Sequence, residues 1–247
     1  MLTYNDNMQK DLIKSRFKKS LKTYEAHAVV QKQMASKLVE LTDKKYYNTI
    51  LELGCGTGFL TKEVVKNIDF NSYYAVDIVE DCESYIGSIS EKIQFICEDI
   101  ERLNIDIKPD LIVSNAAFQW IEKFSEFADK INRILPDGGS FVFSLFGEDN
   151  YNEITNILPN KLNYLSPDKI KDIFKNDKIC HVQEERIVLN FNSPKDVLYH
   201  MKYTGVNALK QVKWTKHDLA EFEKQYKEVC GEKITLTYHP IYVKVVK

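Results

Sequence analysis

The chain has 247 residues, 44% of them hydrophobic, which is enough for one domain with a sizeable core and a further elaboration. The formal net charge of -2 argues against nucleic acid as the main partner, because nucleic-acid-binding domains usually carry a basic excess. No stretch approaches about eighteen apolar residues, and the N-terminus is polar and basic, so neither a membrane span nor a signal peptide is expected. These features predict a cytoplasmic protein without a membrane partner.

The five cysteines are scattered and form no C-x-x-C pair, which favours free thiols over disulfides or a zinc site. The five histidines show none of the spacings that are typical of metal-binding motifs. We therefore expect no metal in this protein.

The first informative segment follows an expected helical region over residues 1–47. A short apolar strand, Ile50–Leu53, runs into a loop with three glycines at alternate positions, Gly54-Cys-Gly-Thr-Gly58, and a helix is expected from Leu60 to about Asn67. Glycine has no Cβ, so such a loop can bring its backbone close to a ligand, and the helix start offers N–H groups to an anionic part of that ligand. The alternative is an ordinary tight turn between a strand and a helix.

The spacing of the glycines restricts the class of ligand that the loop can bind. It is G-x-G-x-G, whereas a dinucleotide-binding loop requires G-x-G-x-x-G and a phosphate-binding loop ends in Gly-Lys-Ser/Thr. The stretch from Leu51 to Gly58 instead resembles the first motif of class I S-adenosylmethionine (SAM) methyltransferases. This resemblance implies cofactor contacts from Glu52, Gly54, Cys55, Gly56 and Gly58. We interpret Cys55 as a small residue that fits a crowded turn rather than as a reactive thiol.

Three further strands end in residues that suit the same cofactor. Strand Tyr73–Val76 leads to Asp77, about twenty residues beyond the loop, where a carboxylate can accept both hydroxyl protons of a ribose. Strand Ile93–Cys97 leads to Glu98 and Asp99, of which we assign Asp99 to the adenine amino group on the basis of the superfamily resemblance. Further cofactor contacts are expected from Ile78, Ile100 and Ser114. A fourth strand, Leu111–Asn115, opens into a loop that should face the transferable methyl group.

The remaining elements complete an alternating pattern of strands and helices. A helix over Phe124–Leu135 precedes a strand over Ser140–Leu145, a sixth strand is expected within Ile179–Phe191, and the alternating tail Ile234–Val246 predicts a final antiparallel strand. The alternation predicts an α/β fold with a mostly parallel sheet. The resemblance to class I methyltransferases implies their Rossmann-like fold, with a seven-stranded sheet and a helical lid.

We expect a single SAM-dependent methyltransferase domain over residues 1–247. Residues 48–192 and 231–247 form its Rossmann-like core, whereas residues 1–47 and 193–230 are helical and are interpreted as two parts of a lid over the cofactor. Simple packing of these helices on the edge of the sheet is the alternative.

Several motifs together resemble one family, the malonyl-acyl-carrier-protein O-methyltransferases of biotin synthesis. Arg16-Phe17, followed by Tyr24, Ala28 and Gln31, is similar to the leading helix pattern R-F-x6-Y-x3-A-x2-Q of that family. The similarity continues through Leu51–Gly58, Ser114–Trp120, Phe143–Gly147, Lys202–Ala208 and Leu236–His239. It thus covers nearly the whole chain.

The resemblance implies methyl transfer from SAM to the free carboxylate of a malonyl thioester, carried by acyl carrier protein or coenzyme A, with S-adenosylhomocysteine as the other product. The resulting methyl ester would enter the pimeloyl branch of biotin synthesis. A carboxylic acid has a pKa near about 4, so it is ionised at neutral pH and needs no general base. Charge on both reactants declines toward the transition state, so catalysis should depend on alignment, desolvation and lid closure.

Acceptor-side residues are expected in the lid and after the fourth strand. Tyr24 is assigned tentatively as the catalytic residue that orients the carboxylate, with simple helix packing as the alternative. The residues expected to border the substrate are Tyr24, Asn115, Gln119, Trp120, Lys202 and Asn207. Lysines in residues 1–25 and 195–216 could form a docking face for an acidic carrier protein, or could simply be solvated.

Three other functions remain open from the sequence. The chain could methylate a small free acid, as a trans-aconitate-type enzyme does, or an oxygen or nitrogen of another metabolite. It could also be a non-catalytic regulator that binds SAM.

Overall fold

A computed structural model describes residues 4–155, 157–158, 162, 164–205 and 215–247. It divides into two compact units, each of which is described by itself. The large unit consists of Val30–Glu148, Asn163–Glu185 and Pro240–Lys247. The small unit consists of Met1–Val29, Asp149–Leu162 and Arg186–His239.

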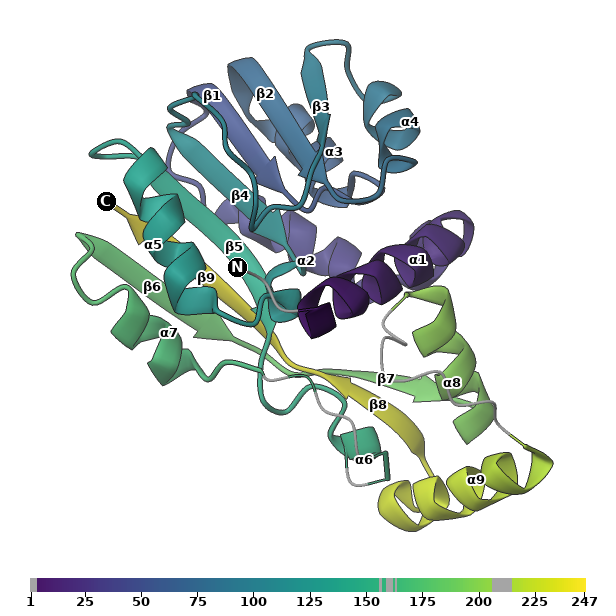
Figure 1. Ribbon diagram of the computed structural model, residues 1–247. Coiled ribbons are helices and arrows are strands. Elements are labelled where there is room, and N and C mark those ends of the chain that lie inside the picture. The colour runs from purple at the N-terminus through teal and green to yellow at the C-terminus, as the bar shows by residue number, and fades with distance from the viewer. Residues whose placement is uncertain (1–3, 156, 159–161, 163, 206–214) are drawn as a thin grey trace. The chain divides into compact units, whose positions relative to one another are not determined.

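The large unit is built on a seven-stranded sheet with the strand order β3-β2-β1-β4-β5-β9-β6 (Figure 1). Its strands are β1 (Tyr46–Leu53), β2 (Asp69–Asp77), β3 (Ile93–Cys97), β4 (Leu111–Asn115), β5 (Ser140–Phe146), β6 (Ile179–Glu184) and β9 (Pro240–Val246). β1 to β5 run parallel, and β9 is antiparallel to both of its neighbours, β5 and β6. The expected seven-stranded, mostly parallel sheet with an antiparallel last strand is confirmed.

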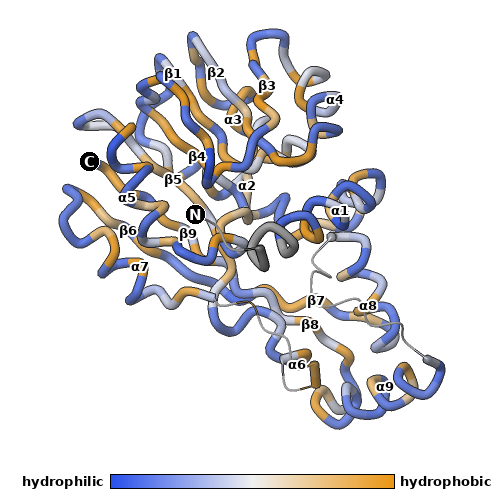
Figure 2. The backbone as a smooth tube through the Cα atoms, in the orientation of Figure 1, coloured by the Kyte–Doolittle hydropathy of each residue, from blue (hydrophilic) through white to orange (hydrophobic). Residues whose placement is uncertain are grey.

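Helices cover both faces of this sheet, because its central strands are apolar on both sides. In Figure 1, α5 (Phe124–Ile134) and α7 (Pro167–Ile173) lie in front of the sheet, whereas α2 (Val29–Glu40) and α3 (Phe59–Asn67) lie behind it. Buried side chains of α5 and α7 pack with phenylalanines of β5 in one hydrophobic core. Figure 2 shows hydrophobic residues along the strands, whereas the helices alternate between hydrophobic and hydrophilic residues, as expected for elements with one buried side.

The small unit contains helices and a separate two-stranded sheet. Its helices are α1 (Tyr4–His27), α6 (Asn152–Thr155), α8 (Pro194–Tyr203) and α9 (Lys216–Cys230), and its strands are β7 (Ile187–Phe191) and β8 (Ile234–Tyr238). α1 packs on α8: Thr23 Oγ1 donates to the carbonyl oxygen of Tyr203 (3.1 Å), and the rings of His27 and Tyr203 stack with centroids 4.6 Å apart. Two segments that are far apart in the sequence therefore lie side by side.

Side-chain caps fix the starts of three helices. Ser166, Ser193 and Thr215 each accept a hydrogen bond from a backbone N–H in the first turn of α7, α8 and α9, respectively. Thr215 also forms a capping box with Asp218. α8 ends at Tyr203, before Gly205 (φ 70°).

Two strand predictions need correction. The segment Ile179–Phe191 holds two strands rather than one, and the predicted final strand Ile234–Val246 is interrupted at His239. At this break the backbone N–H of His239 donates to Asn150 Oδ1 (3.2 Å), and His239 Nδ1 accepts from the N–H of Asp149 (3.1 Å). The next residue, Pro240, has no N–H and occurs at the first position of β9, where a proline is tolerated. β7 and β8 therefore pair with each other outside the large sheet.

The bounds of the two units differ from those of the segments expected from the sequence. The expected leading segment 1–47 divides, since α1 belongs to the small unit and nearly all of α2 to the large one. β7 and β8 belong to the small unit, although the sequence places them with the core. The sequence did not predict α4 (Cys82–Gly87) or the 3-10 helix η1 (Phe118–Trp120).

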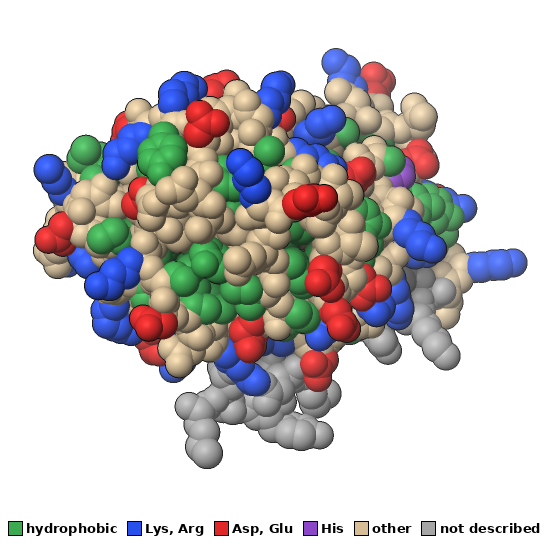
Figure 3. Space-filling model, turned by 90° about the horizontal axis from the view of Figure 1, so that it is seen from above, with side chains coloured by type: hydrophobic (Ala, Val, Ile, Leu, Met, Phe, Trp, Pro, Cys, Tyr) green, Lys and Arg blue, Asp and Glu red, His purple; other side chains and the backbone are tan. Residues whose placement is uncertain are grey.

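Within the described part of the chain, no helix has the length and apolar character needed to cross a membrane. Acidic and basic side chains are interspersed over the face seen in Figure 3, with hydrophobic side chains between them.

Candidate functional site

The glycine loop lies at the carboxyl end of β1, against the end of β2. The N–H groups of Gly54 and Cys55 both donate to the carbonyl oxygen of Val76 (2.8 and 3.0 Å). Gly54 has φ 75°, and a Cβ at this position would lie 2.6 Å from Ala117 Cβ, so the backbone is in close contact with the segment that follows β4. Gly58 has φ 83°, and the atom nearest to an added Cβ there is Ile89 Cδ1, the end of a flexible side chain that could move aside, so the backbone conformation is what favours glycine. Both positions therefore favour glycine.

The side chain of Asp77, the last residue of β2, is hydrogen-bonded to this loop. Its Oδ2 accepts from the N–H of Gly56 and its Oδ1 from the N–H of Val79, each at 2.9 Å, and the residue is only 6% exposed. Burial raises the pKa of Asp77, against the opposing effect of these two hydrogen bonds. A carboxylate oxygen accepts more than one hydrogen bond, so contact with a ribose is compatible with these bonds and stays a prediction.

Glu52 is buried behind the loop. Its Oε2 accepts hydrogen bonds from Thr61 Oγ1 (2.6 Å) and Tyr73 OH (2.5 Å), which link β1 to the first turn of α3 and to β2. Burial raises the pKa of Glu52 to about 7, although the hydrogen bonds from Thr61 and Tyr73 lower it. Sequence reasoning assigned Glu52 to the cofactor but missed Thr61 and Tyr73, which have no motif of their own.

Cys55 is also buried within the loop. Burial raises the pKa of its thiol well above the usual value, so the side chain packs as a neutral group. This agrees with its interpretation as a small packing residue.

The end of β3 lies next to the end of β2. The N–H of Glu98 donates to the carbonyl oxygen of Asp77 (3.0 Å), and Asp99 Oδ1 accepts from the N–H of Glu101 (3.0 Å). Asp99 is partly buried, with Arg102 Nε 3.7 Å from its Oδ2. Ile78 and Ile100, which follow the two acidic residues, are both partly buried.

A network of polar side chains follows β4. Ser114 Oγ donates to the carbonyl oxygen of Leu53 (2.7 Å), which joins β4 to the start of the glycine loop. Asn115 Oδ1 accepts from Ser144 Oγ (2.8 Å), and Ser144 Oγ accepts from the N–H of Ala116 (3.2 Å). Ala116 has φ 52°, an uncommon conformation for a residue with a Cβ and one that is often found at functional sites.

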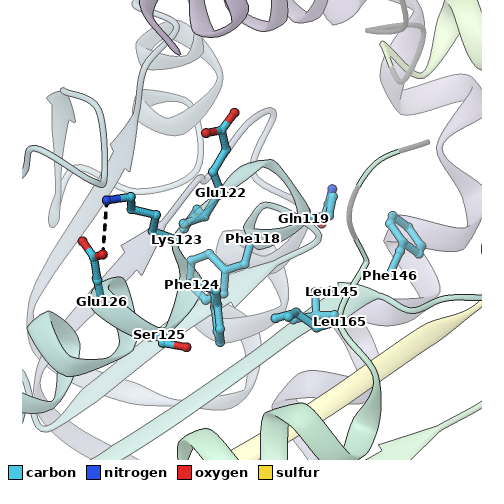
Figure 4. Close-up of a pocket in the computed structure, with 11 residues that line it drawn as sticks. Phe118, Gln119, Glu122, Lys123, Phe124, Ser125, Glu126, Leu145, Phe146 and Leu165 are labelled. Carbon is cyan, nitrogen blue, oxygen red and sulfur yellow. Dashed lines mark ion pairs between the residues drawn. The ribbon is translucent and has the colours of Figure 1, made fainter. Parts of the chain in front are cut away.

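A pocket of about 280 Å³ opens beside η1 in the large unit. Phe118 and Phe124 lie side by side in it, with ring centroids 5.7 Å apart, and Leu145 and Leu165 also line it (Figure 4). Gln119 lies at one side of the pocket, whereas Glu122 points away from the phenylalanine rings (Figure 4). Trp120, the last residue of η1, is partly buried.

The structure thus brings together one group of the predicted residues in the large unit. Glu52, Gly54, Cys55, Gly56, Gly58, Asp77, Ile78, Asp99, Ile100, Ser114, Asn115, Gln119 and Trp120 lie at or next to the carboxyl ends of β1 to β4. This is the edge at which open α/β sheets bind their ligands.

The other predicted residues belong to the small unit or fall outside the description. Tyr24 on α1 is partly buried, and its ring meets that of Phe17 edge to face at 5.2 Å. Lys202 on α8 is exposed. Asn207 lies outside the described residues, as do Lys210 and Lys213 of the expected docking face.

Two residues of the site were not assigned from the sequence. Ser144 lies within the motif Phe143–Gly147, and Gln31 lies within the leading pattern, but neither was given a role. The signal for Gln31 was its place on the apolar side of α2, among Val30, Met34 and Ala35, where a polar residue requires a partner.

These residues fit a SAM cofactor. The glycine loop is confined at Gly54, Thr57 Oγ1 is buried and has no hydrogen-bond partner among the described residues, and Asp77 follows at the neighbouring strand end. Among the described residues, no group of three or more His, Cys, Asp and Glu side chains is placed to hold a metal ion.

Comparison with known proteins agrees with this geometry. Residues 51–143 match the methyltransferase domain family. The structure is similar to YcgJ from Bacillus subtilis (TM-score 0.65, 13% identity, 87% of this chain and 98% of the other) and to a plantazolicin methyltransferase solved with S-adenosylhomocysteine (TM-score 0.54, 14% identity, 96% and 95%). The fold and the site together define a SAM-dependent methyltransferase.

Relatives of similar length narrow this class. The chain is 38% identical over 239 residues to the malonyl-[acyl-carrier protein] O-methyltransferase of Calditerrivibrio nitroreducens, a match that covers 95% of this chain and 96% of the relative. It is 30% identical over 244 residues to the protein of the same name from Haemophilus influenzae, covering 96% and 94%. The chain belongs to the malonyl-[acyl-carrier protein] O-methyltransferase family.

Proposed function

We propose that this protein transfers a methyl group from SAM to the free carboxylate of a malonyl thioester, carried by acyl carrier protein or by coenzyme A. The observation that carries the proposal is the match to relatives of that name over nearly the full length of both chains. The product would be the methyl ester that enters biotin synthesis, and S-adenosylhomocysteine would be released. Cytoplasmic localisation and the lack of a bound metal are part of the same proposal.

The donor side is formed by the large unit. When bound, SAM supplies an electrophilic methyl group on a positively charged sulfur. Asp77 would accept hydrogen bonds from the ribose and Asp99 from the adenine amino group, while the backbone at Gly54 and Gly56 would lie against the cofactor. The hydrogen bonds from Gly56 and Val79 to Asp77 support this role, because they hold the carboxylate in place before the cofactor binds.

The acceptor side requires positioning rather than proton transfer. A malonyl carboxylate is ionised at neutral pH, so no side chain needs to remove a proton. The residues of η1, Phe118 to Trp120, have no general base among them, which is consistent with such a substrate. The pocket beside η1 has an apolar part, formed by Phe118, Phe124, Leu145 and Leu165, which supports exclusion of water there, and Tyr24 is the proposed orienting residue of the acceptor.

An acidic carrier protein would dock on the small unit. α1 and α8 pack on each other, and exposed lysines lie on both helices, namely Lys19, Lys22, Lys195 and Lys202. Tyr199 lies between the two lysines of α8 and is 42% exposed, with Lys195 Nζ 5.7 Å from the centre of its ring. A basic surface with an exposed aromatic ring suits an acidic helical partner through charge and apolar contact.

One assay tests the proposal against its rivals. Tritiated SAM is offered with malonyl-carrier protein, malonyl-CoA, trans-aconitate and acetyl-carrier protein, and base-labile methyl ester is counted. The proposal requires transfer to a malonyl thioester and none to acetyl-carrier protein, whose acyl group has no free carboxylate. Transfer to trans-aconitate alone would support the small-acid enzyme, and SAM binding without any transfer would support a regulator. Complementation of a biotin-requiring strain tests the pathway.

A further inference from the structure

Arg16 on α1, the first residue of the leading motif, takes no part in the methyl transfer described above. The residue is partly buried, and its Nη1 atom is buried without a hydrogen-bond partner among the residues that the structure describes. Burial lowers the pKa of the Arg16 guanidinium, yet an arginine stays protonated at neutral pH. A charged donor held away from water is unfavourable unless an acceptor meets it, which indicates an anionic partner.

The sequence around Arg16 supplies no carboxylate at the spacing of an ion pair within the helix. Such pairs form between residues three or four positions apart, and these positions on α1 are occupied by Leu12, Ile13, Lys19 and Ser20. The residues outside the described part of the chain contain no Asp or Glu either; they are 1–3, 156, 159–161, 163 and 206–214. The anion is therefore expected from a ligand.

Within the small unit, Arg16 belongs to the side of α1 that packs on α8 (Figure 1). Ser20 lies against Gly205, just beyond the end of α8, since a Cβ on Gly205 would lie 2.7 Å from Ser20 Oγ. Residues four apart share one side of a helix, so Arg16 lies one turn further along the same side of α1. The proposed docking surface for the carrier protein is on these two helices, with the exposed lysines Lys19, Lys22, Lys195 and Lys202.

The proposed substrate carries three kinds of anion, which differ in how well they suit Arg16. The malonyl carboxylate loses charge toward the transition state, so an arginine on it would mainly stabilise the ground state and slow the transfer. Acidic side chains on the surface of a carrier protein suit exposed lysines rather than a buried nitrogen. The phosphate ester at the head of the pantetheine arm is on a flexible chain and keeps its charge throughout the reaction. Its oxygens also match the planar fork of a guanidinium group.

We propose that Arg16 binds the phosphate ester at the head of the pantetheine arm, a group that acyl carrier protein and coenzyme A share. This inference rests on the proposed function, because it concerns the substrate of that reaction. Tyr24, the proposed orienting residue, lies about 12 Å further along the same helix. The extended arm is longer than this separation, so its phosphate and its malonyl end can meet the two residues at once. Binding of an unreactive group stabilises the ground state and the transition state equally, so Arg16 should affect KM and not kcat.

Two truncated substrates, malonyl-phosphopantetheine and malonyl-pantetheine, differ only in the phosphate and therefore test this contact. In the wild-type protein the phosphate should lower KM about tenfold and leave kcat unchanged. Arg16→Gln should raise the KM for malonyl-phosphopantetheine to that for malonyl-pantetheine, which should not change. Arg16→Lys keeps the charge without the planar fork and should restore part of the difference. The matched control is Arg133→Gln, which removes the same charge at an exposed position of the large unit and should change neither KM.

Calorimetry tests the same contact without turnover. Wild-type protein saturated with S-adenosylhomocysteine should bind phosphopantetheine about tenfold more tightly than pantetheine, and Arg16→Gln should remove this difference. Equal affinities of the wild type for the two ligands would overturn the inference even if the variant does not fold. Equal losses for both ligands in Arg16→Gln would also overturn it, as would a rise in KM confined to malonyl-carrier protein, which would assign Arg16 to an acidic side chain of the carrier. Phosphate-dependent binding without methyl transfer to any malonyl thioester would instead overturn only the proposed function.

Discussion

Glu52 of the large unit and His200 of the small unit are both buried, and their contributions to stability change with pH in opposite directions. In the large unit, burial raises the pKa of Glu52 to about 7. In the small unit, burial and then the nearby His27 lower the pKa of His200 to about 4, and His200 Nε2 lies 2.6 Å from Tyr238 OH. Burial therefore favours the neutral form of both groups, which is the protonated carboxyl of Glu52 and the unprotonated ring of His200.

Because of this difference, the stabilities of the two units should change in opposite directions with pH. The Glu52 contribution to stability is present at low pH and is lost as the pH rises from about 4.5 toward 7, since the folded protein then binds more protons than the unfolded one. The His200 contribution is present above about pH 6.5 and is lost as the pH falls toward 4. Titration of Glu52 should favour the large unit in mild acid, and titration of His200 should favour the small unit at neutral pH.

The largest expected effect concerns the close contacts of the glycine loop. Gly54→Ala should lower the free energy of unfolding by about 4 kcal/mol, because φ 75° is strained for alanine and the new Cβ would lie 2.6 Å from Ala117 Cβ. Urea unfolding measures this loss. Gly138→Ala, also in the large unit, is the matched control, since Gly138 has positive φ and no atom within 4 Å of the added Cβ. It should cost only about 1 kcal/mol; equal losses at both positions would show that the loop is not confined.

The second effect concerns the buried carboxyl group of the large unit. Glu52→Gln keeps an acceptor for Thr61 and Tyr73 but removes the titration, so the dependence of stability on pH between about 5 and 7 should flatten. The slope lost corresponds to about 3 kcal/mol over that range. Urea unfolding at several pH values measures it, with the exposed Glu91→Gln as control. A variant with the same pH profile as the wild type would show that Glu52 is ionised in the folded protein.

The sequence predicts the large unit better than the small one, for a physical reason. β1 to β5 are apolar segments bounded by local turn and cap signals, and Gly54, Asp77 and Asp99 directly follow their strands. The break at His239 instead depends on Asp149 and Asn150, about 90 residues earlier in the chain. The only local sign of this break was Pro240, which lacks the N–H that a continuous inner strand needs.

The same distinction holds within the candidate site. The glycine spacing indicates a cofactor loop because Gly54, Gly56 and Gly58 each adopt a positive φ, which is a local requirement of the backbone. Gln31 Oε1 and Gln119 Oε1 are buried without a hydrogen-bond partner among the described residues. Their burial depends on how α2, β4 and β5 pack together, which no short motif encodes. Contacts of this kind become visible only when the elements are placed together.

The third effect concerns the buried histidine of the small unit. His200→Gln should remove the loss of stability that the wild type shows as the pH falls from about 6.5 to 4, up to about 2 kcal/mol. Hydrogen exchange of β8 amides, corrected for intrinsic rates, reports this unit directly. His181→Gln is the control, because His181 is exposed in the large unit. If His200→Gln and the wild type lose protection of β8 in parallel, His200 is not the titrating group.

The smallest expected effect is on association with the carrier protein. It compares the two units by the KM for this substrate rather than by their stability. Reversing Lys195 and Lys202 to glutamate should raise the KM for malonyl-carrier protein about three- to tenfold and leave kcat unchanged, since rim charges mainly alter association. The KM for a malonyl thioester of a small uncharged thiol should not change. The rise in KM for malonyl-carrier protein should become smaller at high salt, where exposed charges are screened. Lys66→Glu with Lys92→Glu makes the same change in charge at exposed positions of the large unit. If this control pair raises the KM equally, net charge governs encounter; only a selective effect of the α8 lysines assigns docking to the small unit.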